Sequence, residues 1–127
     1  MSIRGFKNHF YDSRVKAIAV LAPGLGELFD ENSLLKINIP VFILEAEKDE
    51  IIKSYNMFIH RGDLPQSFQY AMLEGAGHYA FLPLCSDYIR NIEQKICYDP
   101  DVRRKILHNI IQQQILVFFN NIFIKSN

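Results

Sequence analysis

The sequence has no excess of charge of either sign. Fourteen basic and fourteen acidic side chains cancel over 127 residues, and the longest basic run is residues 103–105. Binding to nucleic acid or to an anionic membrane surface depends on clustered positive charge, which this sequence lacks. We therefore expect neither nucleic acid nor a membrane as a partner.

Long apolar segments are missing as well. Residues 1–8 contain no apolar core of a signal peptide, and apolar runs elsewhere fall far short of the roughly 20 residues that cross a bilayer. The composition, with 49% apolar and 22% charged residues, is ordinary for a globular protein. These features predict a single domain over residues 1–127 and a cytoplasmic location, or export if a signal was lost upstream.

Cysteine is scarce, with Cys85 and Cys97 alone. Because no export signal is present, two free buried thiols in a reducing compartment are the favoured interpretation. The alternative is a disulfide that ties the segment after His78 to the start of the last helix. A zinc site made with His108 lacks the ligand spacing of structural zinc motifs, so no metal is expected.

Three short stretches predict β-strands. Residues 16–22, which are apolar from Ala17 onward, are closed by Pro23 and Gly24 and predict a strand buried on both faces. A second buried strand over residues 41–44 follows Pro40, a residue that a strand permits at its start. Residues 67–73 alternate between apolar and polar side chains and predict a third, partly exposed strand.

Helices are expected between and after these strands. The patterns predict one turn over residues 33–36, an amphipathic helix over 51–59, and a helix from Ser86 or Asp87 toward residue 96. The last helix is the clearest, with Asp99 as its N-cap and Pro100 at its first position. Its apolar stripe is expected to contain Val102, Ile106, Leu107, Ile110, Ile111 and Ile115, and it continues through Phe118, Phe119 and Phe123.

Strands alternating with helices over short connections indicate an α/β protein with about three parallel strands and flanking helices. Ligands of such sheets bind beyond the carboxyl ends of the strands. Asp49 follows the second strand and His78 follows the third, so both are expected at that edge. A carboxylate beside an imidazole fixes the tautomer of the ring, which can then act as general base and general acid near neutral pH.

Other polar residues are weaker candidates. Glu45, Glu47 and Glu50 lie close enough to Asp49 in the sequence to orient the imidazole in its place. His60 is typical of the polar end of a helix, His108 of a packed or hydrogen-bonded side chain, and His9 has no informative neighbours. Residues 24–26 lack the third glycine of a dinucleotide-binding loop, so no cofactor is expected.

Three segments together resemble the C-terminal half of an α/β-hydrolase. They are residues 12–24, residues 39–43 with Asp49 behind them, and residues 75–82 around His78. The nearest group is the dienelactone hydrolase-like enzymes, which are similar to chlorophyllases and platelet-activating-factor acetylhydrolases. The tail, from Cys97-Tyr98-Asp99 through Arg103, His108 and Phe118-Phe119, also resembles that group, so the resemblance spans nearly the whole chain.

The resemblance implies a partial α/β-hydrolase fold and a serine ester hydrolase, with Asp49 as the orienting acid, His78 as the base and no cofactor. In that family the nucleophile is a serine in a Gly-x-Ser-x-Gly turn, which occurs nowhere in these 127 residues. Ala46 also replaces a glycine that commonly precedes the acid. Three local serines, Ser54, Ser67 and Ser86, are not placed on a strand-to-helix elbow.

Two functions follow from this pattern. The first is the C-terminal half of an ester hydrolase, inactive alone, which would act on a small ester or lactone once reunited with a nucleophile-bearing half. The second is a non-catalytic remnant that acts as an oligomeric or interaction protein. For the second, a homo-oligomer is expected through an unpaired strand edge near Ala17 to Leu21 or through the apolar end of the last helix.

Overall fold

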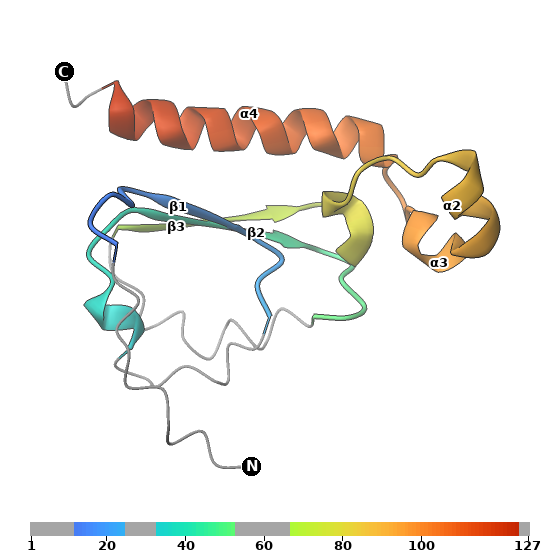
Figure 1. Cartoon of the computed structure of the whole chain (residues 1–127), viewed down its shortest axis with the longest axis horizontal. Coiled ribbons are helices and arrows are strands. Elements are labelled where there is room, and N and C mark those ends of the chain that lie inside the picture. Colours follow the sequence, from blue (N-terminus) through green and yellow to red (C-terminus); the bar gives the residue numbers. More distant parts are fainter. Residues whose placement is uncertain (1–11, 25–32, 53–66, 125–127) are drawn as a thin grey trace, which may run out of the picture.

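A parallel sheet of three strands forms the centre of the fold (Figure 1). This computed structural model describes residues 12–24, 33–52 and 67–124. Strands β1 (Ile18–Leu21), β2 (Val41–Ala46) and β3 (Phe68–Leu73) lie in the order β1-β2-β3, and both pairings are parallel. The predicted α/β architecture with three parallel strands and flanking helices is therefore confirmed.

Strand β2 is buried along its whole length, and the apolar run at residues 41–44 predicts this burial for its first four residues. Phe42, Leu44 and Ala46 belong to the core on the side of the last helix. Because side chains alternate along a strand, Glu45 lies on the opposite face, where the residue is 5% exposed and its carboxylate accepts a hydrogen bond from the Tyr70 hydroxyl at 2.8 Å. The strand thus continues two residues past the predicted end at residue 44.

Strand β1 is shorter and more exposed than predicted. It begins at Ile18 and ends at Leu21, and both of these side chains are more than one-third exposed. The expectation of burial on both faces is wrong because β1 is the edge strand of the described sheet. Ala22 has a positive φ of 44°, a conformation that strands do not use, and this explains why the strand stops before it.

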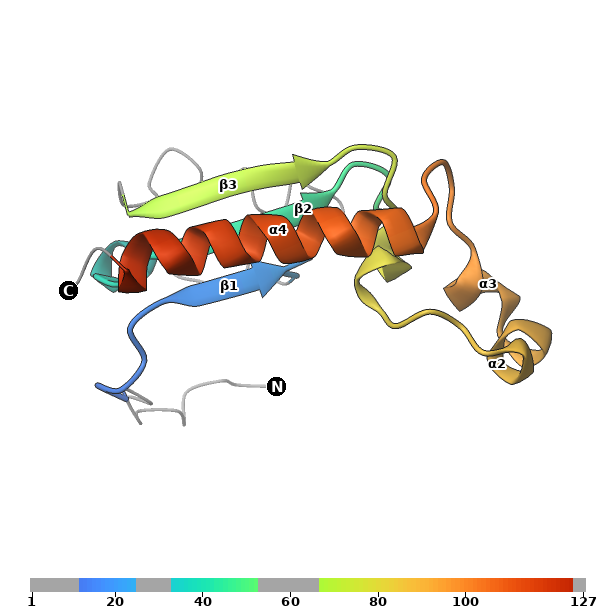
Figure 2. The same cartoon turned by 90° about the horizontal axis from the view of Figure 1, so that it is seen from above.

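Helix α4 (Arg104–Phe123) lies over β2, between β1 and β3 (Figure 2). Its buried stripe contains Leu107, Ile111 and Phe118, and the Phe118 ring stacks on Phe42 at a centroid distance of 5.5 Å. Three residues of the predicted stripe, Ile106, Ile110 and Phe123, are exposed instead. The predicted stripe was too wide, because a helix on a three-stranded sheet buries only the side chains that face the sheet.

The start of α4 also differs from the prediction. Asp99 and Pro100 precede the helix, whose first residue is Arg104. Asp99 nevertheless accepts a hydrogen bond from the backbone N–H of Arg104 at 2.9 Å, so it satisfies a donor of the first turn from outside the helix. Val102 likewise lies before the helix but packs against the core.

Shorter helical segments complete the fold. The predicted turn is the 3₁₀ helix η2 (Leu34–Lys36), and a second 3₁₀ helix, η4 (His78–Phe81), follows β3. Of the two residues expected at the start of the next helix, Ser86 is the N-cap, since its hydroxyl accepts a hydrogen bond from the Ile89 N–H at the start of α2 (Asp87–Ile92). Helix α3 (Gln94–Cys97) follows after a break at Glu93. Most of the helix predicted over residues 51–59 lies outside the described residues.

Cys85 and Cys97 form a disulfide, so the favoured interpretation of two free thiols is wrong. Their Cα atoms are 5.8 Å apart, because α2 and α3 fold back on each other and bring the two ends of the segment together. The bond closes a short loop beyond the carboxyl edge of the sheet (Figure 1). No described helix is long and apolar enough to cross a membrane.

Removal of this disulfide should destabilise the protein. A cross-link across a loop of about a dozen residues lowers the entropy of the unfolded chain by an amount worth about 2 to 3 kcal/mol. We expect the double variant Cys85→Ser, Cys97→Ser to lose about that much free energy of unfolding in urea. Addition of dithiothreitol to the wild type should reproduce the loss and should leave the double variant unchanged. An equal effect of the reductant on both proteins would contradict the assignment.

Candidate functional site

The loops that follow β2 and β3 are bonded to each other at the carboxyl edge of the sheet. The N–H of Glu47 donates to the Leu73 carbonyl at 3.0 Å, and the N–H of Lys48 donates to the Ala76 carbonyl at 2.8 Å. The Glu47 carboxylate in turn accepts from the Gly75 N–H at 2.8 Å. These three bonds fix the loop that carries Asp49 relative to the loop that leads to His78.

Gly75 and Gly77 allow the second loop to pack closely. Gly75 has a φ of +67°, which favours glycine, and a Cβ atom there would lie 2.8 Å from the Val102 side chain. A Cβ atom on Gly77 would lie 3.2 Å from Pro100. The small residues before His78 therefore bring the chain against the segment that precedes α4.

Asp49 and His78 are in direct contact, as the sequence predicts. The Nδ1 atom of His78 lies 2.8 Å from Oδ2 of Asp49. The other oxygen of Asp49, Oδ1, accepts from the backbone N–H groups of Ile51 and Ile52 at 2.9 Å and 2.6 Å. The carboxylate is 5% exposed and the imidazole 22% exposed, so the acid is enclosed while the ring reaches solvent.

This geometry determines the tautomer of the imidazole. A carboxylate only accepts hydrogen bonds, so the neutral His78 ring carries its proton on Nδ1 and leaves Nε2 with a free lone pair. Tyr79 packs edge-on against the ring at a centroid distance of 5.3 Å. The pair can therefore take a proton at Nε2 and stabilise the resulting imidazolium, which is the chemistry of a general base.

The other candidate acids do not orient His78. Glu45 is bonded to Tyr70 on the far side of the sheet, and Glu47 is bonded to the Gly75 N–H. One Glu50 oxygen lies near Gly77, 3.5 Å from the position of a Cβ atom there. Lys48 forms an exposed ion pair with Asp101, and this hydrogen bond raises the pKa of the lysine.

Within the described residues, the other candidate histidines and serines make no hydrogen bond to Asp49 or His78. The Nε2 of His108 bonds two backbone carbonyl oxygens, which confirms that it is a hydrogen-bonded histidine. Ser67 lies before β3 at the opposite edge of the sheet, and Ser86 caps α2. His9, Ser54 and His60 lie outside the described residues. Within the described ranges, no cluster of three or more histidine, cysteine or acidic side chains could hold a metal ion.

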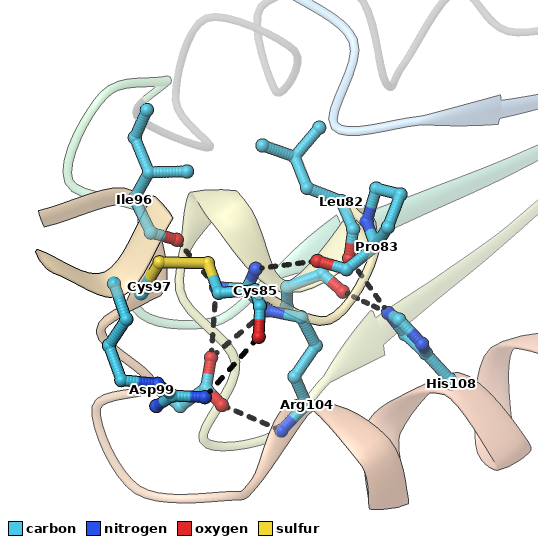
Figure 3. Close-up of polar contacts among 10 residues, drawn as sticks. Leu82, Pro83, Cys85, Ile96, Cys97, Asp99, Arg104 and His108 are labelled. Carbon is cyan, nitrogen blue, oxygen red and sulfur yellow. Dashed lines mark hydrogen bonds and ion pairs between the residues drawn. A yellow bond between two sulfur atoms is a disulfide. The ribbon is translucent and has the colours of Figure 1, made fainter. Parts of the chain in front are cut away.

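Sequence reasoning missed a buried arginine beside the site. Arg104 is 2% exposed, and its guanidinium bonds Asp99 and the carbonyl oxygens of Pro83 and Ile96 (Figure 3). The available signal was its position, three and seven residues before Leu107 and Ile111 on the buried stripe of α4. A charge on an apolar stripe predicts a buried ion pair.

The fold and this site together define an α/β protein that carries an Asp–His pair at the carboxyl edge of a parallel sheet. No protein-family model matches the sequence, and neither a curated protein nor a solved structure matches the chain.

Proposed function

We propose that Asp49 and His78 are the acid and base of an ester-hydrolysing site whose serine nucleophile is supplied from outside these 127 residues. The observation that carries the proposal is the 2.8 Å contact between His78 Nδ1 and Asp49 Oδ2, with Oδ1 held by two backbone N–H groups. The resemblance to dienelactone hydrolase-like enzymes supports the same roles. The substrate class is a small ester or lactone.

In the proposed reaction, Nε2 of His78 removes the proton of the serine hydroxyl as the oxygen attacks the ester carbonyl. The imidazolium then gives that proton to the leaving alcohol. In the second half, water attacks the acyl-enzyme with His78 again as base, and the imidazolium returns the proton to the serine oxygen as the carboxylic acid leaves. Asp49 accepts the hydrogen bond from Nδ1 in both halves and stabilises the imidazolium. The oxyanion donors come with the nucleophile.

Reassembly tests this proposal. The chain would be co-expressed with the N-terminal half of a dienelactone hydrolase-like enzyme that carries the Gly-x-Ser-x-Gly turn, and the complex isolated by size exclusion. Hydrolysis of p-nitrophenyl acetate should exceed the sum of the separate halves by roughly 10² to 10⁴-fold, the usual contribution of general acid–base catalysis. The chain alone should be no faster than its His78→Ala variant.

Two variants make the test specific. His78→Ala should return the complex to background, whereas Glu50→Gln, a neighbouring exposed acid that does not bond His78, should keep the full rate. An isolated complex that shows no gain in esterase activity would contradict the proposal. Activity that survives His78→Ala would contradict it as well, because another base would then be responsible.

The second candidate function is an interaction protein that self-associates through α4. Between Lys105 and the end of the helix no residue is acidic or basic apart from His108. The exposed apolar side chains on the outer side of this part and at the C-cap of the helix are Ile106, Ile110, Leu116, Val117, Phe123 and Ile124. If each of these side chains buries roughly 100 Å², two paired copies would bury about 1,200 Å² in total, which is the lower limit for a stable interface.

The spacing of these residues favours a helix pair. Ile110, Val117 and Ile124 repeat every seven residues, and β-branched side chains at such positions favour two-stranded packing. We expect a dimer in sedimentation velocity at about 10 μM, a concentration typical of moderate affinity. Val117→Lys should convert it to a monomer, and Lys105→Gln should not. A wild-type monomer would rule out this candidate.

The disulfide bears on the location proposed for either function. Disulfides persist in oxidising compartments and are rare in the cytosol. The Cys85–Cys97 bond therefore favours an exported protein over the cytoplasmic location that the sequence predicts.

A further inference from the structure

Two side chains at the start of α4 hold the chain immediately after His78. Nε2 of His108 lies 3.0 Å from the carbonyl oxygen of Ala80 and 3.0 Å from that of Leu82. One helical turn earlier, Nη1 of Arg104 donates to the Pro83 carbonyl at 3.1 Å. Figure 3 shows both side chains directed toward this segment.

Displacement of the Arg104 guanidinium from this position would raise the free energy of the folded protein. Arg104 is 2% exposed, and its other donors bond Oδ1 of Asp99 at 3.1 Å and the Ile96 carbonyl at 2.7 Å. A guanidinium keeps its charge at any ordinary pH and presents donors in a rigid plane. Arg104 therefore joins the segment after His78, the disulfide-closed α2–α3 loop and the first turn of α4.

The turn that carries His78 depends on such bonds. Helix η4 has four residues, and a 3₁₀ helix of this length has little stability of its own. Upstream, the Ala76 carbonyl is bonded to the Lys48 N–H. Downstream, the carbonyl groups of Ala80 and Leu82 are held by His108. The position of the imidazole opposite Asp49 is thus fixed from both sides of the turn.

We infer that His108, supported by Arg104, is a positioning residue for His78. Its Nε2–H donates to two carbonyl groups of the turn, so that Nδ1 of His78 stays within hydrogen-bond distance of Asp49. This inference rests on the proposed function for its catalytic consequence. A misplacement of about 1 Å in such a group costs about a hundredfold in rate, so a loosened turn should lower kcat and leave KM nearly unchanged.

The test compares three replacements of His108. Leucine removes the donor at similar size. Glutamine places an N–H₂ group near the position of Nε2, whereas asparagine is too short to reach the carbonyl oxygens. Gln112→Leu serves as the control, because Gln112 lies one turn further along α4, lines a pocket together with His108 and Pro83, and is exposed. Thermal unfolding monitors whether each variant is folded.

The main readout is the low-field proton resonance of the His78 Nδ1–H, which requires no activity. We expect it in the wild type, in His108→Gln and in the control, and expect it broadened or lost in His108→Leu and His108→Asn. Amide exchange over residues 78–82 should be about tenfold faster in the last two, as expected for local opening. If His108→Leu does not fold, the comparison of His108→Gln with His108→Asn tests the positioning role of His108.

An unchanged His78 resonance in a folded His108→Asn variant would overturn the inference, and so would a failure of His108→Gln to restore it. In the reassembled complex, kcat should fall by about tenfold or more for His108→Asn while KM stays within about twofold. A complex that is inactive although the wild-type resonance is present would contradict the proposed function and leave the positioning role intact.

Discussion

Replacement of Asp49 by asparagine should lower kcat of the reassembled complex nearly to background, a loss of about 10²- to 10⁴-fold, or about 3 to 5.5 kcal/mol of transition-state stabilisation. The upper value equals that known for the same replacement in a serine protease triad. In this protein the expected loss follows from the hydrogen bonds that surround Asp49. Two backbone N–H groups point at Oδ1, so the amide oxygen of the variant must take that place.

The amide N–H₂ group would then face Nδ1 of His78, where the carboxylate oxygen was. An N–H donor at this position forces Nδ1 to accept and moves the ring proton to Nε2. The imidazole can no longer remove a proton from the serine. Because asparagine has the shape of aspartate, the melting temperature should change little while the activity is lost.

The measurement is kcat with p-nitrophenyl acetate, with Glu50→Gln as the matched control. Glu50 lies one position after Asp49 and is exposed, so its neutralisation changes the net charge equally without a bond to His78. We expect the control to stay within about twofold of the wild type, as is usual for a surface change. Equal losses in both variants would show that general electrostatics, and not the orientation of the ring, accounts for the effect.

Replacement of Arg104 by methionine should lower the free energy of unfolding by about 3 to 4 kcal/mol. The methionine fills a similar volume but leaves the carbonyl groups of Pro83 and Ile96 without a donor. It also leaves Asp99, whose side chain is 26% exposed, without its cation. Because Asp99 is partly exposed, we expect the loss in free energy of unfolding to fall in the lower part of the range for a broken buried ion pair.

Arg103→Met is the control for this prediction. Arg103 is the adjacent residue, is exposed, and makes no side-chain cap to the helix. Its replacement should change the free energy of unfolding by less than about 0.5 kcal/mol in urea denaturation. A loss below about 1 kcal/mol for Arg104→Met would mean that the guanidinium contributes little beyond its desolvation cost.

The proximity of the loops that carry Asp49 and His78 was predictable because it follows from the topology of the sheet. Carboxyl ends of parallel strands meet at one edge, so a residue three positions beyond β2 and one five positions beyond β3 fall near each other. The spacing of residues in the sequence does not distinguish Asp49 from Glu47 as the acid that orients His78. That choice depends on the turn at residues 49–52, which directs Oδ1 at two N–H groups and Oδ2 at the ring.

The errors in the sequence analysis have local physical causes. The run at residues 16–22 is as apolar as that of β2, yet composition does not distinguish an edge strand from a central one. The disulfide was the less favoured interpretation because residues 1–8 contain no export signal. The bond instead follows from the packing of α2 on α3, which brings Cys85 and Cys97 together. Asp99 was expected at the N-cap of α4, but it lies before the N-cap residue Arg103 and bonds both the backbone N–H and the guanidinium of Arg104.

The most direct test of the central claim is the ¹⁵N–¹H correlation spectrum of the imidazole rings, recorded at about pH 8, above the ordinary pKa of histidine. If Asp49 orients His78 for base catalysis, Nδ1 of His78 should carry the proton and Nε2 should be bare, and Asp49→Asn should reverse this pattern. A wild-type ring protonated at Nε2, or one whose tautomer does not respond to Asp49→Asn, would contradict the account.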